Sequence, residues 1–205
     1  NGFFHTESKK SGYIDSLSLW IYESALRDYA LLLKEGYNLP QISINLSARE
    51  FTRLNLTKNL VRFGEKFNIS PSRITLEITE TSVFSNPVVA NRILQDLRDA
   101  GFRLAIDDFG AGYAGISYFK EIPFDIIKID KSLVKDLQEK GEDSIMPIFE
   151  SLKLLANRKK LEIVVEGIER KSELEVLSKL GFTMFQGYYF FRPMRLADLR
   201  EELKK

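Results

Sequence analysis

The sequence predicts an α/β protein in which parallel strands form a barrel, and two patterns lead to this expectation. Six short apolar strands alternate with helical segments along 205 residues, an order typical of parallel strands joined by right-handed crossovers. Each strand also has aliphatic side chains on one face and a polar side chain near its C-terminal end on the other. A doubly wound open sheet, with helices on both faces, has no good place for these polar residues. A closed barrel does, because its interior opens at the C-terminal ends of the strands.

The strands are identified by β-branched and aliphatic residues in alternation, bounded by turn residues. They are expected at residues 41–46, 73–80, 103–108, 125–130, 161–166 and 183–186. A TIM-type (β/α)8 barrel needs eight strands, so six βα units leave two strands unaccounted for. The chain begins at Asn1 without Met or a leader. We therefore expect residues 1–205 to be one domain of a modified (β/α)8 barrel whose two N-terminal strands precede Asn1.

The helices are recognised by apolar stripes at helical spacing and by residues that begin or end a helix. Asp15 or Ser16 can cap the first helix, and Gly36 stands where that helix should end. Gly141 interrupts the long helical stretch before the fifth strand, which predicts two helices there. A short helix is also expected before Pro123. The main helices are expected at about residues 15–34, 56–67, 86–100, 131–140, 142–155, 171–180 and 196–203.

Composition indicates a soluble globular domain and excludes several functions. Hydrophobic residues make up 44% and charged residues 29% of the chain, and the net charge is +1. Such a balance gives no reason to expect a nucleic-acid polymer or an anionic membrane as a partner. The absence of cysteine excludes disulfides and thiolate metal sites. No apolar run is long enough to span a bilayer.

The polar residues on the interior faces are the candidate site. They are Asn45, Glu77, Asp107, Lys128, Glu166 and Gln186, one from each strand in chain order. Any one of them could be an ordinary strand end, and a carboxylate opposite Lys128 could form a structural ion pair. Six strands that follow one rule favour a site at the C-terminal mouth of the barrel instead.

The stretch LAIDDFGAGY, residues 104–113, suggests which chemistry this site supports. An apolar strand leads into Asp107 and Asp108, and a buried carboxylate needs a metal, a cation or water. Oxygen ligands without His or Cys suit Mg²⁺ or Mn²⁺ rather than Zn²⁺. Two such ions could be held by the aspartates, with Lys128 contacting a phosphate or the attacking water. The expected reaction is two-metal hydrolysis of a phosphate ester.

Six motifs in this order resemble those of EAL domains, a family of phosphodiesterases that open cyclic di-GMP to linear pGpG. The motifs are INLS (44–47), LEITE (76–80), DDFGAGY (107–113), KID (128–130), VEGIE (165–169) and QGYYFFRP (186–193). The resemblance implies a modified (β/α)8 barrel with one antiparallel strand and two metal ions at its C-terminal mouth. It further implies a homodimer, fusion to upstream sensory or GGDEF domains, and a cytoplasmic location, which includes the cytoplasmic part of a membrane-anchored protein.

Carried onto this sequence, the resemblance assigns a role to each candidate residue. Metal ligands would be Asn45, Glu77, Asp107 and Asp108, with Asp107 shared by both ions. The catalytic group would be Lys128, Glu166 and Gln186, together with Glu80, which would tether the loop 108–113. Substrate binding is assigned to Asp130 and Pro193.

Two departures from the family pattern keep a second function open. The Glu-Ala-Leu signature, which contains a family metal ligand, is absent and is expected upstream of Asn1. Ala114 and Gly115 also replace a pair of serines that is usual in the family loop. The alternative is therefore a catalytically inactive cyclic-di-GMP receptor or regulatory module. A pure dimerisation or interaction scaffold is disfavoured because it leaves the polar mouth unexplained.

Overall fold

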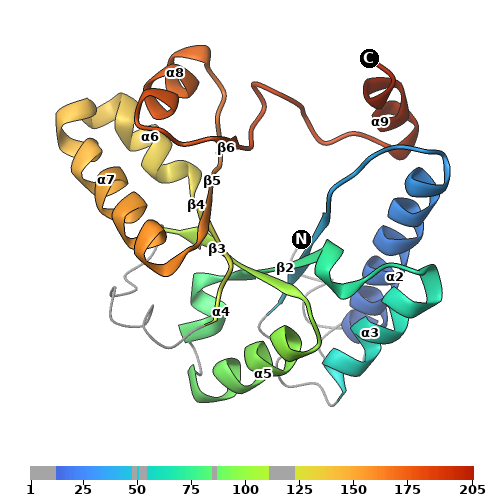
Figure 1. Ribbon diagram of the computed structural model, residues 1–205. Coiled ribbons are helices and arrows are strands. Elements are labelled where there is room, and N and C mark those ends of the chain that lie inside the picture. The colour runs from blue at the N-terminus through green and yellow to red at the C-terminus, as the bar shows by residue number, and fades with distance from the viewer. Residues whose placement is uncertain (1–12, 48–49, 51–54, 85–86, 111–122) are drawn as a thin grey trace.

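The computed structural model describes residues 13–47, 50, 55–84, 87–110 and 123–205 (Figure 1). Its strands are β1 (Ile42–Leu46), β2 (Ile74–Thr79), β3 (Arg103–Phe109), β4 (Ile126–Ile129), β5 (Glu162–Val165) and β6 (Met184–Phe185). They form one sheet in chain order from β1 to β6, and each neighbouring pair is parallel. The parallel α/β architecture predicted from the alternating pattern is confirmed, and each predicted strand exists.

Helices connect the strands and lie around the outside of the curved sheet (Figure 1). They are α2 (Tyr13–Lys34), α3 (Leu56–Phe67), the 3₁₀ turn η2 (Pro71–Arg73), α4 (Glu80–Phe84), α5 (Pro87–Asp99), α6 (Lys131–Lys140), α7 (Glu142–Lys159), α8 (Lys171–Lys179) and α9 (Leu196–Leu203). The predicted interruption at Gly141 separates α6 from α7. The short helix expected before Pro123 lies outside the described residues.

Several predicted boundaries differ from the structure: α2 begins at Tyr13, so that Asp15 and Ser16 lie inside it, and α7 continues to Lys159. One difference affects the candidate site. The second strand was expected to continue through Glu80, but β2 ends at Thr79 and Glu80 begins the short helix α4. The alternation of polar and apolar residues continues to Glu80 and so gave no sign of the end. At this point the Thr79 and Ser82 hydroxyls are hydrogen-bonded at 2.6 Å across the first turn of α4. Glu80 is buried at the start of this helix.

The hydrophobic core lies between the sheet and the helices. Alternate strand residues such as Leu76, Ile78, Leu104 and Ile127 are fully buried, as the period-two pattern predicts. Their burial against the helices leaves the other face of each strand to the polar positions. None of the described helices combines the length and apolar character needed to cross a lipid bilayer.

The last helix is attached near the first. Figure 1 shows the chain running from β6 across to α9, which lies beside the end of α2. Arg200 of α9 donates hydrogen bonds of 2.7 and 2.6 Å to the carboxylate of Glu35. The two-pronged geometry of a guanidinium on a carboxylate orients the helix as well as attaching it.

Candidate active site

The parallel register brings the polar residues to one edge of the sheet. Asn45 on β1 lies opposite Glu77 on β2, and Thr79 on β2 lies opposite Asp107 on β3. Lys128 on β4 lies opposite Val164 on β5, and Val164 is two residues before Glu166 in the sequence. Because all strands are parallel, their carboxyl ends open on the same side. The sequence prediction that these residues share a face is consistent with this register.

Lys128 is the centre of the cluster. Its Nζ lies 2.7 Å from Glu77 Oε2, 2.8 Å from Glu166 Oε1 and 3.1 Å from Asp107 Oδ1. The lysine side chain is only 6% exposed, so its charge is compensated by these carboxylates and hardly by water. Glu77 and Asp107 lie on β2 and β3, and Glu166 directly follows β5. One ammonium group on β4 therefore connects β2, β3 and the end of β5.

Asp107 has an oxygen that the protein does not satisfy with a hydrogen bond. Its Oδ1 is buried, and although Lys128 Nζ is 3.1 Å away, no described group donates a hydrogen bond to it. Its contact with the Lys128 ammonium is thus an ion pair that lacks hydrogen-bond geometry. Such an atom is expected at a position that binds a cation.

A β-bulge brings Asp108 into the same cluster. In the β3–β4 register Ile106 pairs with Ile127 and Phe109 with Ile129, so β3 has one extra residue in this interval. Asp108 has a φ of 55°, the left-handed conformation that Asp tolerates better than most residues. In a regular strand, Asp107 and Asp108 would point to opposite faces. With the bulge, single oxygens of Asp107, Asp108 and Glu166 all lie within 4.8 Å of one another.

The charges of the cluster are unbalanced. Burial alone would lower the pKa of Lys128, but the Glu77 and Glu166 carboxylates outweigh burial and raise it above its ordinary value. Burial raises the pKa of Glu166 despite its hydrogen bond with Lys128. Burial and the neighbouring charges of Asp107 and Asp130 raise the pKa of Asp108. Among the described residues, three carboxylates contact the Lys128 ammonium, and Asp108 lies near the charges of Lys128 and Lys131. The carboxylates outnumber the ammonium groups, which favours binding of further cations.

These residues fit a site for divalent metal ions. The unsatisfied Asp107 oxygen, the nearby Asp108 and Glu166 oxygens, and the absence of sulfur and imidazole donors from this cluster suit a hard cation such as Mg²⁺ or Mn²⁺. The spacing of the oxygens, within 4.8 Å, allows one ion to contact more than one of them.

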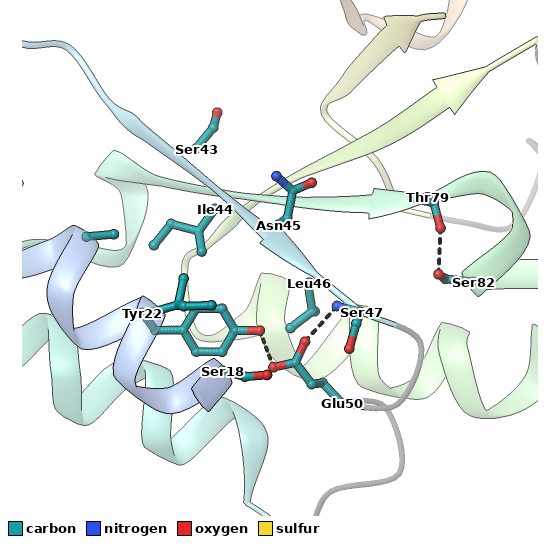
Figure 2. A pocket seen from close by; sticks show the side chains of 12 residues that line it. Ser18, Tyr22, Ser43, Ile44, Asn45, Leu46, Ser47, Glu50, Thr79 and Ser82 are labelled. Atoms are coloured by element: carbon teal, nitrogen blue, oxygen red, sulfur yellow. Dashed lines mark hydrogen bonds between the residues drawn. The ribbon is translucent and has the colours of Figure 1, made fainter. Parts of the chain in front are cut away.

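Asn45 lies on the face of β1 that points away from α2 (Figure 2). Figure 2 shows Ser43 and Asn45 pointing to one side of β1, while Ile44 and Leu46 point to the other, toward α2. A cavity of about 550 Å³ borders this strand, and Asn45, Thr79 and Ser82 are among its lining residues. The Asn45 side chain is exposed, and no contact with the carboxylates is recorded for it among the described residues.

Glu50 is a residue that the sequence analysis did not single out. Its side chain is 1% exposed, and it accepts hydrogen bonds from the hydroxyl of Tyr22 on α2 and, at 2.6 Å, from the backbone N–H of Ser47 (Figure 2). It therefore fixes the turn that follows β1, two residues beyond Asn45. Glu50 lies four residues beyond the end of β1, and its burial is not visible in the sequence.

Two further candidates are placed by hydrogen bonds close to the cluster. Glu80 Oε2 accepts a hydrogen bond of 3.2 Å from the backbone N–H of Gly110, just after β3. The expected tether of the loop is thus present at Gly110, whereas residues 111–113 lie outside the described residues. Asp130 caps α6, because its Oδ1 accepts a hydrogen bond of 2.9 Å from Ser132 N. Its charge also contributes to the raised pKa of Asp108.

Gln186 and Pro193 are not brought into contact with the cluster by any recorded side-chain interaction of the described residues. Gln186 follows β6 and is exposed, while its backbone N–H donates to Val165 O at 2.9 Å. Pro193 is exposed in the connection from β6 to α9. Their predicted roles, and likewise those of the other candidate residues, stay predictions.

The fold and the cluster together define a class: a parallel α/β domain with a lysine–carboxylate centre at the carboxyl ends of its strands. Within this class, the family model described as the EAL domain matches residues 3–193. The chain therefore belongs to the EAL domain family, as the motif series predicted.

Curated relatives support this assignment. The probable cyclic di-GMP phosphodiesterase PdeA of Escherichia coli is 39% identical over 159 residues, which is 78% of this chain and 22% of that protein. The chain spans only about a quarter of the length of the curated relatives that it matches.

Solved structures show that the fold is that of EAL domains with a TIM-barrel-like architecture. The PaMucR phosphodiesterase in complex with c-di-GMP superimposes with a TM-score of 0.86 at 30% identity, over 97% of this chain and 79% of that chain. A manganese and cyclic-di-GMP complex of Klebsiella pneumoniae BlrP1 has a TM-score of 0.78 at 31% identity, over 87% of this chain and 44% of that chain.

Proposed function

We propose that this chain is the catalytic domain of a metal-dependent phosphodiesterase that hydrolyses cyclic di-GMP to linear pGpG. The observation that carries the proposal is the buried, unsatisfied Asp107 oxygen within a carboxylate cluster built around Lys128. Support comes from relatives that are named cyclic di-GMP phosphodiesterases and from related structures that contain this nucleotide. Two Mg²⁺ or Mn²⁺ ions, held by Asp107, Asp108, Glu77 and Asn45, would supply Lewis acidity and a water of lowered pKa.

The residues of the chain contribute orientation and charge. Lys128, fixed by Glu77 and Glu166, presents a buried positive charge at the point where a phosphodiester would carry developing negative charge. Its raised pKa keeps it protonated at neutral pH, so it acts as an electrostatic stabiliser rather than as a general base. Glu166, whose pKa is raised by burial, is suited to accept a hydrogen bond or a proton from the attacking water.

The positions around the cluster complete the proposal. Gln186 would orient the water or phosphate, and Glu80 would hold the loop after β3 through its contact with Gly110. Asp130 and Pro193 would contact the nucleotide. We further propose that residues 1–205 act as a single cytoplasmic domain of a homodimer with upstream sensory or GGDEF domains, since relatives include a bifunctional cyclase and phosphodiesterase and an oxygen sensor.

Turnover of cyclic di-GMP by the purified full-length protein tests the proposal. Chromatography should show linear pGpG with Mg²⁺ or Mn²⁺ and no product with EDTA. Absence of product with both metals would refute the catalytic function. Calorimetry with the nucleotide then distinguishes the remaining possibilities, because binding without turnover indicates the receptor alternative and no binding eliminates both.

A further inference from the structure

The loop that follows Glu166 is held on two sides by backbone contacts. The backbone N–H of Glu166 donates to Ile129 O at 3.0 Å, which attaches the end of β5 to the end of β4. Two residues later, Ile168 N donates to Gln186 O at 3.1 Å, which attaches the same loop to the end of β6. Between these two bonds lies Gly167, in a left-handed conformation with a φ of 75°.

Gly167 lies directly against the first residue of α6. A Cβ added to Gly167 would overlap the Cβ of Lys131 and would lie 3.0 Å from the Lys131 Cα. These are the root of a helix residue and not the end of a flexible side chain, so Lys131 cannot move aside without moving α6. Lys131 itself is held because the preceding residue Asp130, the N-cap of α6, donates its backbone N–H to Phe109 O at 3.0 Å.

This close approach sets the position of the Glu166 carboxylate. Glu166 is the residue immediately before Gly167. Its Oε1 lies 2.8 Å from Lys128 Nζ, and one of its carboxylate oxygens lies within 4.8 Å of oxygens of Asp107 and Asp108. Relieving a Cβ overlap at Gly167 would require a shift of the loop on the order of an ångström. Displacements of that size in an active site are enough to lower activity about 100-fold.

We propose that Gly167 is a positioning residue: its missing side chain lets the β5 loop pack on Lys131 and so places Glu166 in the carboxylate cluster. The inference rests on the proposed function, because it assigns Glu166 to that metal centre. It predicts that position 167 needs glycine because a side chain would overlap Lys131, and not only because the backbone there is left-handed.

The chain contains a control for the strain of a side chain at positive φ. Gly141, between α6 and α7, has a φ of 81° and a ψ of 162°, a combination almost confined to glycine, and a Cβ there would meet no described atom within 4 Å. Gly141→Ala therefore introduces backbone strain without an overlap, whereas Gly167→Ala introduces both. Mn²⁺ affinity by calorimetry and turnover of cyclic di-GMP are measured for both, with melting temperature as the check on folding.

We expect Gly167→Ala to lower Mn²⁺ affinity and kcat at least about tenfold, the size typical of residues that support metal ligands. Gly141→Ala should change both less than twofold, with a comparable decrease in melting temperature. Unchanged Mn²⁺ affinity and kcat in Gly167→Ala, or equal losses in Gly141→Ala, would overturn the inference. Wild-type protein without Mn²⁺ binding and turnover would instead refute the proposed function on which it rests.

Rescue at Lys131 separates positioning from a general loss of structure. Lys131→Gly removes the Cβ that a methyl group at Gly167 would overlap, whereas Lys131→Ala keeps that Cβ. Both remove the ammonium group that lies near Asp108, so the comparison isolates the steric contact. In the Gly167→Ala background, Lys131→Gly should restore most of the Mn²⁺ affinity and Lys131→Ala should not. Equal behaviour of the two double variants would contradict the proposal.

Discussion

Replacing Asp107 with asparagine tests the proposed centre with the smallest change in shape. The amide occupies the same volume and keeps the strand pairing of β3, but it removes the negative charge from a buried carboxylate oxygen that has no hydrogen-bond donor among the described residues. We expect loss of metal binding and turnover with the fold retained.

The expected size of the effect on stability is small because two electrostatic effects oppose each other. The variant loses attraction to Lys128 Nζ at 3.1 Å, and it also loses repulsion from the Asp108 and Glu166 oxygens within 4.8 Å. Unit charges about 4 Å apart interact by roughly 4 kcal/mol at an effective dielectric constant of 20. Because these contributions have opposite signs, we expect the free energy of unfolding without metal to change by about 1 kcal/mol or less.

The expected effect on turnover is large because no gain compensates the lost ligand. A decrease of about 1,000-fold or more corresponds to about 4 kcal/mol of transition-state stabilisation. Urea unfolding in EDTA measures the stability, calorimetry measures Mn²⁺ affinity, and chromatography of pGpG measures turnover. Asp125→Ala is the control, since Asp125 Oδ2 accepts from Leu104 N at 2.9 Å before β4 begins, at the opposite end of the strands. It should cost about 1 kcal/mol of stability and leave turnover unchanged.

Retention of turnover within about tenfold by Asp107→Asn, with unchanged Mn²⁺ affinity, would show that metal binds elsewhere. A loss of stability of several kcal/mol in EDTA would show that Asp107 has a mainly structural role as a partner of Lys128. Either result would refute the reasoning from the unsatisfied oxygen.

Three further predictions follow from single contacts. Arg103→Met removes an ion pair of 2.8 Å with Glu162 and a hydrogen bond of 2.7 Å to Gln41 Oε1, both at the N-terminal end of the sheet. Urea unfolding should show a loss of about 1 kcal/mol, and turnover should be unchanged; a clear decrease in turnover would contradict this. Glu80→Ala removes the acceptor of the hydrogen bond from the Gly110 N–H and should lower kcat about tenfold, with a smaller change in Mn²⁺ affinity. An unaltered kcat would show that Glu80 does not tether the loop after β3. Burial and neighbouring carboxylates raise the pKa of Asp108, so its folded state binds a proton more tightly than the unfolded state. In EDTA, protonated Asp108 therefore stabilises the folded state at pH values below the ordinary pKa of Asp. This stabilisation decreases as the pH rises through the raised pKa of Asp108. As the pH rises, the melting temperature of Asp108→Asn should decline less steeply than that of the wild-type protein. Identical slopes for the two proteins would refute the expected direction of this pH dependence.

Most of the fold followed from local patterns in the sequence. Period-two alternation located all six strands, and glycines such as Gly36 and Gly141 marked where helices end. The prediction failed at Glu80. The alternation of polar and apolar residues continues past the end of β2, and the hydrogen bonds of α4 are not visible in a pattern of hydrophobicity. Glu50 was missed for a related reason, since its partner Tyr22 lies 28 residues away in sequence.

The sequence by itself determined which residues face the interior, because side chains alternate along any strand whatever surrounds it. It could not show that the Asp108 carboxylate lies in the same cluster as the Asp107 carboxylate, since a bulge exists only in relation to the partner strand β4. Nor could it show that Lys128 contacts three carboxylates or that Gly167 packs on Lys131. Those contacts join segments that are distant in the chain, so their distances are set by the packing of the strands and helices and only the tertiary structure decides them.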